Sequence, residues 1–384
     1  MDKAFEIGPI RPPSEAASLL LRITRNCSWN RCKFCSIYRG EKFSTRSLED
    51  IKADIDQVAN ILHDINEWTR NGEISEPRLI NKILSEKICN EPTEVIQRYY
   101  LVYHWLNQQS DSVFLQDANT VALSFNKLLN ILLYLQEKLP QVKRVTSYGR
   151  VDSLAKFTTT ELTQLKEAGL NRIHSGFETG SDKVLEFIDK GYTKAQAISA
   201  GQNIKTAGIE LSIYFMPGVG GRYLSEDNAL ETADVINKVN PDFVRIRTFS
   251  PKLKTELMDE ITSGRMLPCT EMEKLLEIKT MIANLHNADG YLYSDHTFNL
   301  FEDVQGNMKT DKEKMLAIIE SFENLDRDTQ RRYMLARRIG MVRLLDDMDY
   351  LKKEQIALLN NQLEQLNSDD KFEKFLSECL INTL

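Results

Sequence analysis

The sequence predicts an α/β fold, a partial (β/α)6 TIM-like barrel with a helical insertion after the first βα unit and a helical C-terminal extension. Segments rich in Val, Ile, Phe and Tyr alternate with segments whose apolar residues recur at helical spacing. Repeated strand–helix–strand units give a parallel sheet with helices outside it. Because no dinucleotide-binding fingerprint follows the first strand, six such units favour a barrel over a doubly wound sheet.

The expected strands are 17–24, 112–116, 142–148, 171–176, 209–216, 242–248 and a weaker one at 290–294. A helix capped by Ser47 and Asp50 should run to Trp68. The other helices between the strands are expected at 123–138, 158–168, 182–189 with 194–206, 225–238 and 270–286. Two more, at 77–89 and 93–108, would fill an insertion over 69–110.

Beyond residue 308 the pattern is helical, with helices expected at 310–322, 326–350, 352–367 and 370–382. The predicted organisation is a leader (1–16), a barrel (17–300) and a helical C-terminal region (301–384). A basic run in that last region is interpreted as a solvated helix face balanced by nearby aspartates. It consists of Arg331, Arg332, Arg337, Arg338 and Arg343.

Composition restricts the class of protein. The hydrophobic content of 42% is ordinary for a globular chain, and the net charge of −7 argues against a nucleic-acid surface. The six unevenly spaced cysteines and the absence of a secretory signal predict a cytoplasmic location. No apolar run approaches the length of a membrane span, so no membrane partner is expected.

Three cysteines lie within nine residues, spaced C-x4-C-x2-C, on the loop that leaves the first strand. They are Cys27, Cys32 and Cys35. Thiolates are soft ligands suited to iron–sulfur clusters or zinc. Three thiolates without a nearby fourth would leave one iron of a four-iron cluster open to a substrate atom.

Other interpretations remain open from the residues alone. A closed ferredoxin-type cluster would need a fourth cysteine, and Cys89 is the nearest candidate. Zinc would need a fourth Cys or His, and His63 is the nearest histidine downstream. Chance clustering is the third alternative.

The predicted strand ends carry small and polar residues, where a parallel barrel places its site. Gln116-Asp117-Ala118-Asn119 follows the second strand, and Tyr148-Gly149-Arg150 the third. Ser175-Gly176-Phe177-Glu178 ends the fourth, Met216-Pro217-Gly218 the fifth, and Asp295-His296 the seventh. Any one of these alone is compatible with a plain turn.

The cysteine loop and the order of these strand ends resemble the radical S-adenosylmethionine (radical SAM) enzymes. Their signature is C-x3-C-x-aromatic-C; Phe34 stands in the aromatic place, and the first spacing here is one residue longer. Asp117 and Asn119 correspond to the Gly-Gly-Glu motif that meets the ammonium of SAM. Ser175 and Glu178 resemble the ribose motif, and Met216 and Gly218 the motif flanking adenine. The resemblance covers about residues 17–300.

The resemblance is strongest to the group that contains oxygen-independent coproporphyrinogen oxidase, the tRNA methylthiotransferases and the elongator catalytic subunit. It implies a [4Fe–4S] cluster on the three cysteines that reductively cleaves SAM to a 5′-deoxyadenosyl radical, which abstracts hydrogen from the substrate. It also implies an electron donor such as flavodoxin or ferredoxin. The expected substrate is a small molecule, contacted by Tyr148, Arg150, Asp295 and His296. The alternative is a non-catalytic iron–sulfur or zinc binding protein on a barrel scaffold.

Overall fold

The structure is a computed structural model that describes residues 4–382. The chain divides into two compact units. The first comprises Met1–Ser28, Gly40–His174 and Thr206–Glu210, and the second comprises Trp29–Arg39, Ser175–Lys205 and Leu211–Leu384. The domain boundaries given above stay a prediction.

Parallel strands form the sheet of the first unit, in the order β1-β4-β5-β6. Their bounds are β1 (Leu19–Arg22), β4 (Ser112–Gln116), β5 (Arg144–Tyr148) and β6 (Leu170–Glu178). All five residues of β4 are buried, as expected for a strand covered on both faces. An antiparallel pair, β2 (Thr24–Arg25) and β3 (Ser44–Thr45), follows β1. Since Arg22 pairs with Gln116, the chain leaves β1 and β4 at the same edge of the sheet.

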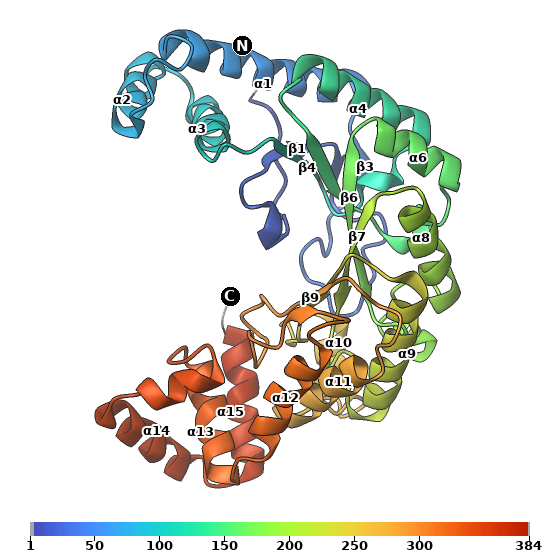
Figure 1. The fold of residues 1–384 in the computed structure, drawn as a ribbon, viewed down its shortest axis with the longest axis vertical. Coiled ribbons are helices and arrows are strands. Elements are labelled where there is room, and N and C mark those ends of the chain that lie inside the picture. The colour runs from blue at the N-terminus through green and yellow to red at the C-terminus, as the bar shows by residue number, and fades with distance from the viewer. Residues whose placement is uncertain (1–3, 383–384) are drawn as a thin grey trace. The chain divides into compact units, whose positions relative to one another are not determined.

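The helices of the first unit are α1 (Leu48–Trp68), α2 (Pro77–Lys87), α3 (Thr93–Asn107), α4 (Phe125–Lys138), α5 (Val151–Leu154) and α6 (Thr159–Glu167), with short 3₁₀ turns η1 (Pro13–Glu15) and η2 (Thr120–Ala122). The N–H of Asp50 donates to Ser47 Oγ at 3.0 Å, so the predicted cap of α1 is present. The two helices expected within 69–110 are present as α2 and α3. Helix α1 lies beside α4 (Figure 1).

The second unit continues the alternation with β7 (Glu210–Phe215), β8 (Phe243–Ile246) and β9 (Tyr291–Tyr293), which are parallel neighbours. A two-residue strand, β10 (Gly306–Asn307), pairs antiparallel with β9 and was not predicted. The helices that accompany these strands are α7 (Asp182–Phe187), α8 (Lys194–Thr206), α9 (Ser225–Val239), α10 (Glu256–Thr262) and α11 (Glu271–Ala283), with the 3₁₀ turn η3 (Arg222–Leu224). Strands and helices in this order confirm the predicted α/β class.

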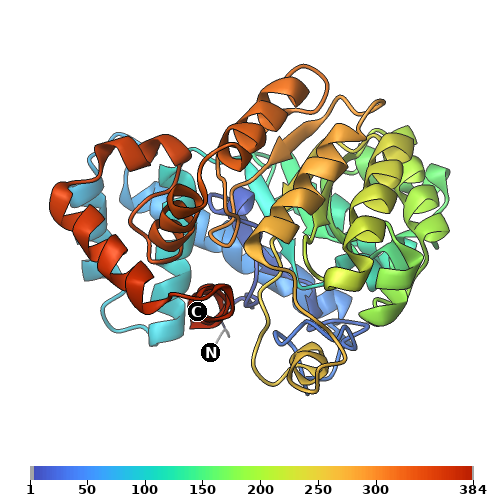
Figure 2. The same ribbon diagram turned by 90° about the horizontal axis from the view of Figure 1, so that it is seen from below.

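The C-terminal helices are α12 (Lys312–Glu323), α13 (Arg327–Arg338), α14 (Lys353–Gln365) and α15 (Asp369–Asn382), with η4 (Leu345–Tyr350) between α13 and α14. Helix α13 lies against α14 and α15 (Figures 1 and 2). The single helix expected over 326–350 was wrong, because α13 ends before Gly340. Gly340 has φ 77°, its N–H donates to Arg337 O, and Met341 N–H donates to Ala336 O. These bonds form a glycine C-cap that ends the helix.

Two side chains of the basic run, Arg337 and Arg338 at the end of α13, are buried, which corrects the interpretation of the run as a solvated face; Arg343 lies beyond the helix and is exposed. Arg338 pairs with Glu271, and both side chains are almost fully covered. Arg337 pairs with Glu302 at 2.9 Å and donates to Asn299 O at 3.1 Å. The sequence could not show this because both acidic partners lie more than thirty residues away in the chain. Between residues 4 and 382, no helix is long and apolar enough to cross a bilayer.

Candidate active site

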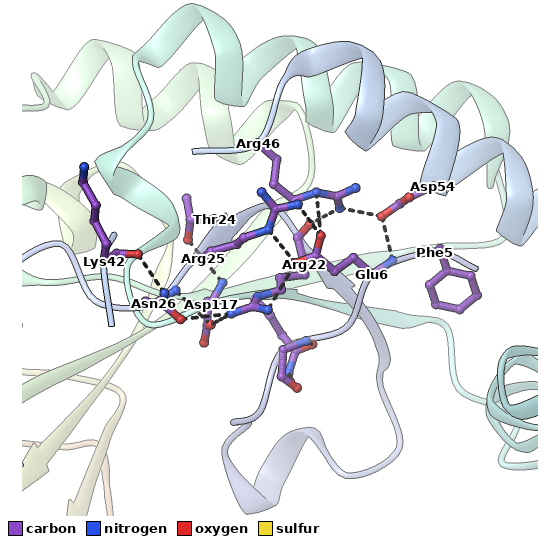
Figure 3. Close-up of polar contacts among 12 residues, drawn as sticks. Phe5, Glu6, Arg22, Thr24, Arg25, Asn26, Lys42, Arg46, Asp54 and Asp117 are labelled. Atoms are coloured by element: carbon purple, nitrogen blue, oxygen red, sulfur yellow. Dashed lines mark hydrogen bonds and ion pairs between the residues drawn. The ribbon is translucent and has the colours of Figure 1, made fainter. Parts of the chain in front are cut away.

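Two residues that follow β4 hold the neighbours of Cys27 on both sides. Asp117 Oδ2 accepts the backbone N–H of Asn26 at 3.2 Å (Figure 3). Asn119 donates through Nδ2 to Ser28 Oγ at 2.7 Å. Asp117 and Asn119 are both fully buried, so their positions are fixed by the interior of the first unit. The start of the cysteine loop is therefore anchored to the end of β4.

Asp117 is itself held by an ion pair. Arg22, the last residue of β1, donates Nη2 to Asp117 Oδ2 at 2.8 Å. The carboxylate of Glu6 pairs with the guanidinium groups of both Arg22, at 3.1 Å, and Arg25, at 2.6 Å (Figure 3). Burial raises the pKa of Glu6, but Arg25 and the other guanidiniums outweigh it and the net pKa lies below its usual value. Glu6 is thus a carboxylate that joins the two arginines at the base of the loop.

Asn119 also fixes the next strand end. Its Oδ1 accepts the backbone N–H of Arg150 at 2.9 Å, and its Nδ2 donates to Ser153 Oγ at 2.8 Å. The Arg150 side chain is buried and pairs with Asp152 at 2.8 Å. Tyr148 packs its ring edge-on against Phe114, with centroids 5.1 Å apart. The first unit therefore brings Asp117, Asn119 and the backbone of Arg150 together around one end of the cysteine loop.

The second half of the cysteine loop belongs to the second unit and is anchored there separately. Lys33 N–H donates to Ile188 O at 2.9 Å, and Lys33 O accepts the N–H of Leu257 at 2.9 Å. Trp29 Nε1 donates to Asp189 O at 2.7 Å, and Arg39 donates to Cys32 O at 2.9 Å. The turn after α7 and the start of α10 thus hold the segment that carries Cys32 and Cys35.

Phe34 and Met216 lie in the same apolar environment. Both pack against a buried cluster that also draws on α7, the loops after β7 and β8, and α10. The cluster consists of Val184, Ile188, Val219, Phe249, Leu257 and Met266. Phe34 and Met216, which are predicted to stand beside the iron–sulfur cluster and the adenine, therefore share one apolar surface in the second unit.

Glu178, at the end of β6, is held by a buried lysine. Lys190 Nζ donates to Glu178 Oε1 at 2.9 Å, and both side chains are less than 10% exposed. Lys190 also lies over the ring of Phe34, 5.4 Å from its centroid. A Cβ added to Gly176 would stand 2.3 Å from Glu178 Oε1, so the glycine leaves room for this carboxylate. Ser175 Oγ is buried and has no hydrogen-bond partner among the described residues. An open hydroxyl and a fixed carboxylate near the end of one strand suit recognition of ligand hydroxyls.

A glutamate that was not among the predicted site residues holds the loop after β7 by hydrogen bonds. Glu277 on α11 accepts the N–H of Gly218 at 2.9 Å and Asn228 Nδ2 at 2.7 Å. Gly218 has φ 83°, a conformation that favours glycine. Burial raises the pKa of Glu277 to about 7, more than its hydrogen bonds lower it. The conformation of Met216-Pro217-Gly218 thus depends on a carboxyl group with a raised pKa.

Asp295 and His296 lie in the second unit, after β9, with a group of cations. Asp295 pairs with Arg245 and, at 2.7 Å, with Arg247. Burial and the charge of Arg247 lower the pKa of His296 to about 4, so its imidazole is neutral near pH 7. The four predicted substrate contacts therefore fall into two pairs, Tyr148 and Arg150 in the first unit and Asp295 and His296 in the second.

The cysteines supply the donor chemistry for a cluster. None of the six, all of which lie in the described part of the chain, forms a disulfide. Within residues 4–382, no three Cys, His, Asp or Glu residues are grouped closely enough to hold a metal ion. The boundary between the units falls after Ser28, so Cys27 is described with the first unit and Cys32 and Cys35 with the second. Three thiols within nine residues nevertheless match the soft donor set that iron–sulfur clusters require.

Several residues that position the predicted site were missed. Lys190, Arg22 and Glu277 act through partners 12 to 95 residues away, and no local pattern marks such pairs. Helix α10 had a detectable signal, since Thr255 caps it and Leu257 and Ile261 follow at helical spacing.

The chain is similar to several known proteins. Residues 106–233 match the radical SAM superfamily. A tRNA uridine(34) acetyltransferase from Methanocaldococcus jannaschii is 29% identical over 30% of this chain and 21% of its own length. A tRNA-2-methylthio-N(6)-dimethylallyladenosine synthase from Aquifex aeolicus is 24% identical over 37% of this chain and 34% of its own. The chain thus spans about a fifth to a third of the length of these curated relatives.

Among solved structures, coproporphyrinogen III oxidase from Escherichia coli aligns with 66% of this chain and 48% of its own, at 12% identity and a TM-score of 0.39. That likeness adds nothing to the assignment, which stands on the superfamily match and the curated relatives. The match confirms the predicted family and, with it, the cofactors that the superfamily uses, a [4Fe–4S] cluster and SAM. The chain carries a radical SAM domain, to which the superfamily match assigns residues 106–233.

Proposed function

We propose that Cys27, Cys32 and Cys35 hold a [4Fe–4S] cluster with one open iron, and that the protein uses it for radical SAM catalysis. When reduced, such a cluster cleaves bound SAM to methionine and a 5′-deoxyadenosyl radical that takes a hydrogen atom from the substrate. The observation that carries the proposal is the double anchoring of the cysteine loop. Asp117 and Asn119 hold the residues around Cys27, while α10 and the turn after α7 hold the segment of Cys32 and Cys35.

We propose contacts to SAM from the residues whose surroundings are described above. Glu178, fixed by Lys190, would accept a ribose hydroxyl, and Ser175 Oγ would bond the other. Phe34 and Met216, which pack against one apolar cluster, would flank the adenine together with Gly218. Asp117 and Asn119 already bond to the loop, so we assign them the positioning of Cys27 in addition to any contact with the SAM ammonium.

The substrate is the open part of the proposal. A small molecule contacted by Tyr148, Arg150, Asp295 and His296 remains our first candidate. The two curated relatives described above are named for reactions on tRNA, which weakens the expectation that nucleic acid is excluded. Both classes should therefore be offered to the reduced enzyme, with flavodoxin or ferredoxin as electron donor. A non-catalytic iron–sulfur or zinc protein is the alternative.

The test begins with anaerobic reconstitution. The protein should bind about four irons, and SAM should change the electron paramagnetic resonance spectrum of the reduced cluster because it becomes a ligand of one iron. Reduction should then yield 5′-deoxyadenosine and methionine. A fully loaded protein whose spectrum ignores SAM, and which forms no 5′-deoxyadenosine, would leave only the binding-protein alternative.

A variant of Glu178 tests the ribose contact separately from the cluster. Glu178→Gln should keep its iron but bind SAM roughly tenfold to a hundredfold more weakly, which is the value of one charge-assisted hydrogen bond. The exposed Glu364→Gln on α14 is a matched control and should bind SAM as the wild type does. Equal SAM affinity in both variants would remove Glu178 from the SAM site.

A further inference from the structure

The ends of β8 and β9 gather positive charge that the proposed chemistry does not use. Arg245 lies in β8, Arg247 follows that strand, and Lys252 lies in the loop beyond it. Arg245 pairs with Tyr293 in the sheet register, so the two strand ends are neighbours within the second unit. Asp295 and His296 follow β9 at this edge, where parallel βα folds place ligand sites.

Charges in this group do not balance. Asp295 is the carboxylate that pairs with Arg245 and Arg247, and Lys252 adds a third cation. Arg338, which also influences the charge on His296, is already paired with Glu271. Arg245, Arg247 and Lys252 against Asp295 leave an excess of about two positive charges. Cations held away from water without counter-charges are costly, so an anionic ligand would stabilise the group.

Three nitrogen atoms of the group are buried and have no hydrogen-bond partner within residues 4–382. They are Arg247 Nη2, Lys252 Nζ and His296 Nδ1. A lysine ammonium has three N–H donors, and the face of an aromatic ring offers no lone pair to accept them. These nitrogens are therefore available to a ligand that carries several acceptor oxygens.

Aromatic rings hold the cationic groups in place. Lys252 Nζ lies 4.8 Å from the centroid of Phe298, whose ring is 4.8 Å from that of His296. Arg247 lies over Tyr214 at 5.3 Å, and Arg245 over Tyr293 at 4.5 Å. Such cation–π contacts restrict the side chains without consuming their hydrogen-bond donors. The donors are thus ordered before any ligand arrives.

We propose that Arg247, Lys252 and His296 form a binding subsite for a phosphate monoester on the substrate, a proposal that deepens the radical SAM function proposed above and rests on it. A phosphate monoester carries close to two negative charges near pH 7 and has three acceptor oxygens. Both the excess charge and the three open nitrogens match this group. A carboxylate would leave one positive charge unmatched. The planar guanidinium of Arg247 and the ammonium of Lys252 are the two side chains that proteins use most often for phosphate.

The experiment uses inorganic phosphate as the probe and the reconstituted full-length protein, at constant ionic strength. Phosphate at about ten times its Kd should raise the Tm of the wild type by about 1–3 °C. Lys252→Met and Arg247→Gln should each bind phosphate roughly tenfold to a hundredfold more weakly. Lys254→Met is the matched control, because it removes the same charge from an exposed position two residues away. It should bind phosphate as the wild type does.

Each result is decisive. Equal phosphate affinity in Lys252→Met, Arg247→Gln and the wild type would overturn the subsite. Acetate that raises Tm as much as phosphate would overturn the assignment to a dianion. Lys252→Met should keep the response of the cluster spectrum to SAM; loss of that response would show that the group binds the SAM carboxylate and would overturn a substrate site. Failure of the proposed radical SAM function can be told apart from failure of the subsite. In that case SAM would leave the cluster spectrum of the wild type unchanged, whether or not phosphate binds.

Discussion

Glu277→Gln tests whether the loop after β7 depends on a carboxyl group with a raised pKa. Glu277 is 2% exposed, and its carboxylate accepts bonds from Gly218 and Asn228. Burial raises its pKa from 4.5 to about 7 in the folded protein. The folded state therefore holds a proton that the unfolded chain releases between about pH 4.5 and 7. Folding stability contributed by this group is full below pH 4.5, falls as the pH rises, and is lost above about pH 7.

The magnitude follows from the two pKa values. At 1.36 kcal/mol per pH unit, the interval from 4.5 to about 7 corresponds to about 3 kcal/mol. Glutamine keeps an acceptor oxygen for Gly218 and cannot ionise, so the variant should lose this pH dependence. Between pH 5 and pH 8, where most of this titration falls, its free energy of unfolding relative to the wild type should rise by about 2–3 kcal/mol.

Urea unfolding of both proteins under anaerobic conditions at pH 5, 6, 7 and 8 measures this difference. Glu364→Gln, an exposed change on α14, is the control and should follow the wild type at every pH. If Glu277→Gln and the wild type show the same slope of stability against pH, Glu277 does not titrate in this range and the reasoning is refuted.

Three further predictions concern the cysteine loop and its neighbours. Changing Cys27, Cys32 or Cys35 to Ala should abolish iron binding on reconstitution, whereas Ser at Cys89, Cys269 or Cys379 should leave the iron content unchanged; loss of iron on changing Cys89 would instead favour a four-cysteine site. Gly176→Ala should displace the Glu178 carboxylate from Lys190 and weaken SAM binding while iron stays bound, and unaltered SAM affinity would contradict the close contact. In a double-mutant cycle, Ser28→Ala and Asn119→Ala should show a coupling of about 0.5–1.5 kcal/mol in unfolding free energy, and no coupling would mean that their hydrogen bond does not form.

Local sequence patterns predicted most of the helices and strands, but not the long-range contacts between them. The strand at 112–116 was predicted to the residue, because the β-forming residues Val113, Phe114 and Leu115 stand in a short segment between turn signals. The two-residue β10 is too short for periodicity to register, and the cap and apolar spacing that mark the seven-residue α10 were overlooked. The long helix expected at 326–350 failed for another reason. The apolar residues keep their helical spacing beyond Gly340, but the φ of 77° at this glycine ends the helix.

The candidate site shows the same division. The cysteines, Asn119, Glu178 and Met216 were marked by their order along the chain, which the sequence displays directly. Lys190, Arg22 and Glu277 were not marked, because a charged residue is usually a solvated one. Their burial becomes evident only when the folded chain supplies Glu178, Asp117 and Gly218 as partners.

Two hydrogen bonds connect the segments in which this chain departs from the usual radical SAM pattern. The spacing between the first two cysteines is one residue longer than usual, and Asp117-Ala118-Asn119 stands after β4, where the resemblance leads us to expect Gly-Gly-Glu. Asn119 donates to Ser28, the first residue of the lengthened spacing, while Asp117 accepts the N–H just before Cys27. A glycine at position 117 could not make the contact to Asn26, since it has no side chain. These two hydrogen bonds anchor the longer cysteine loop to the residues that follow β4.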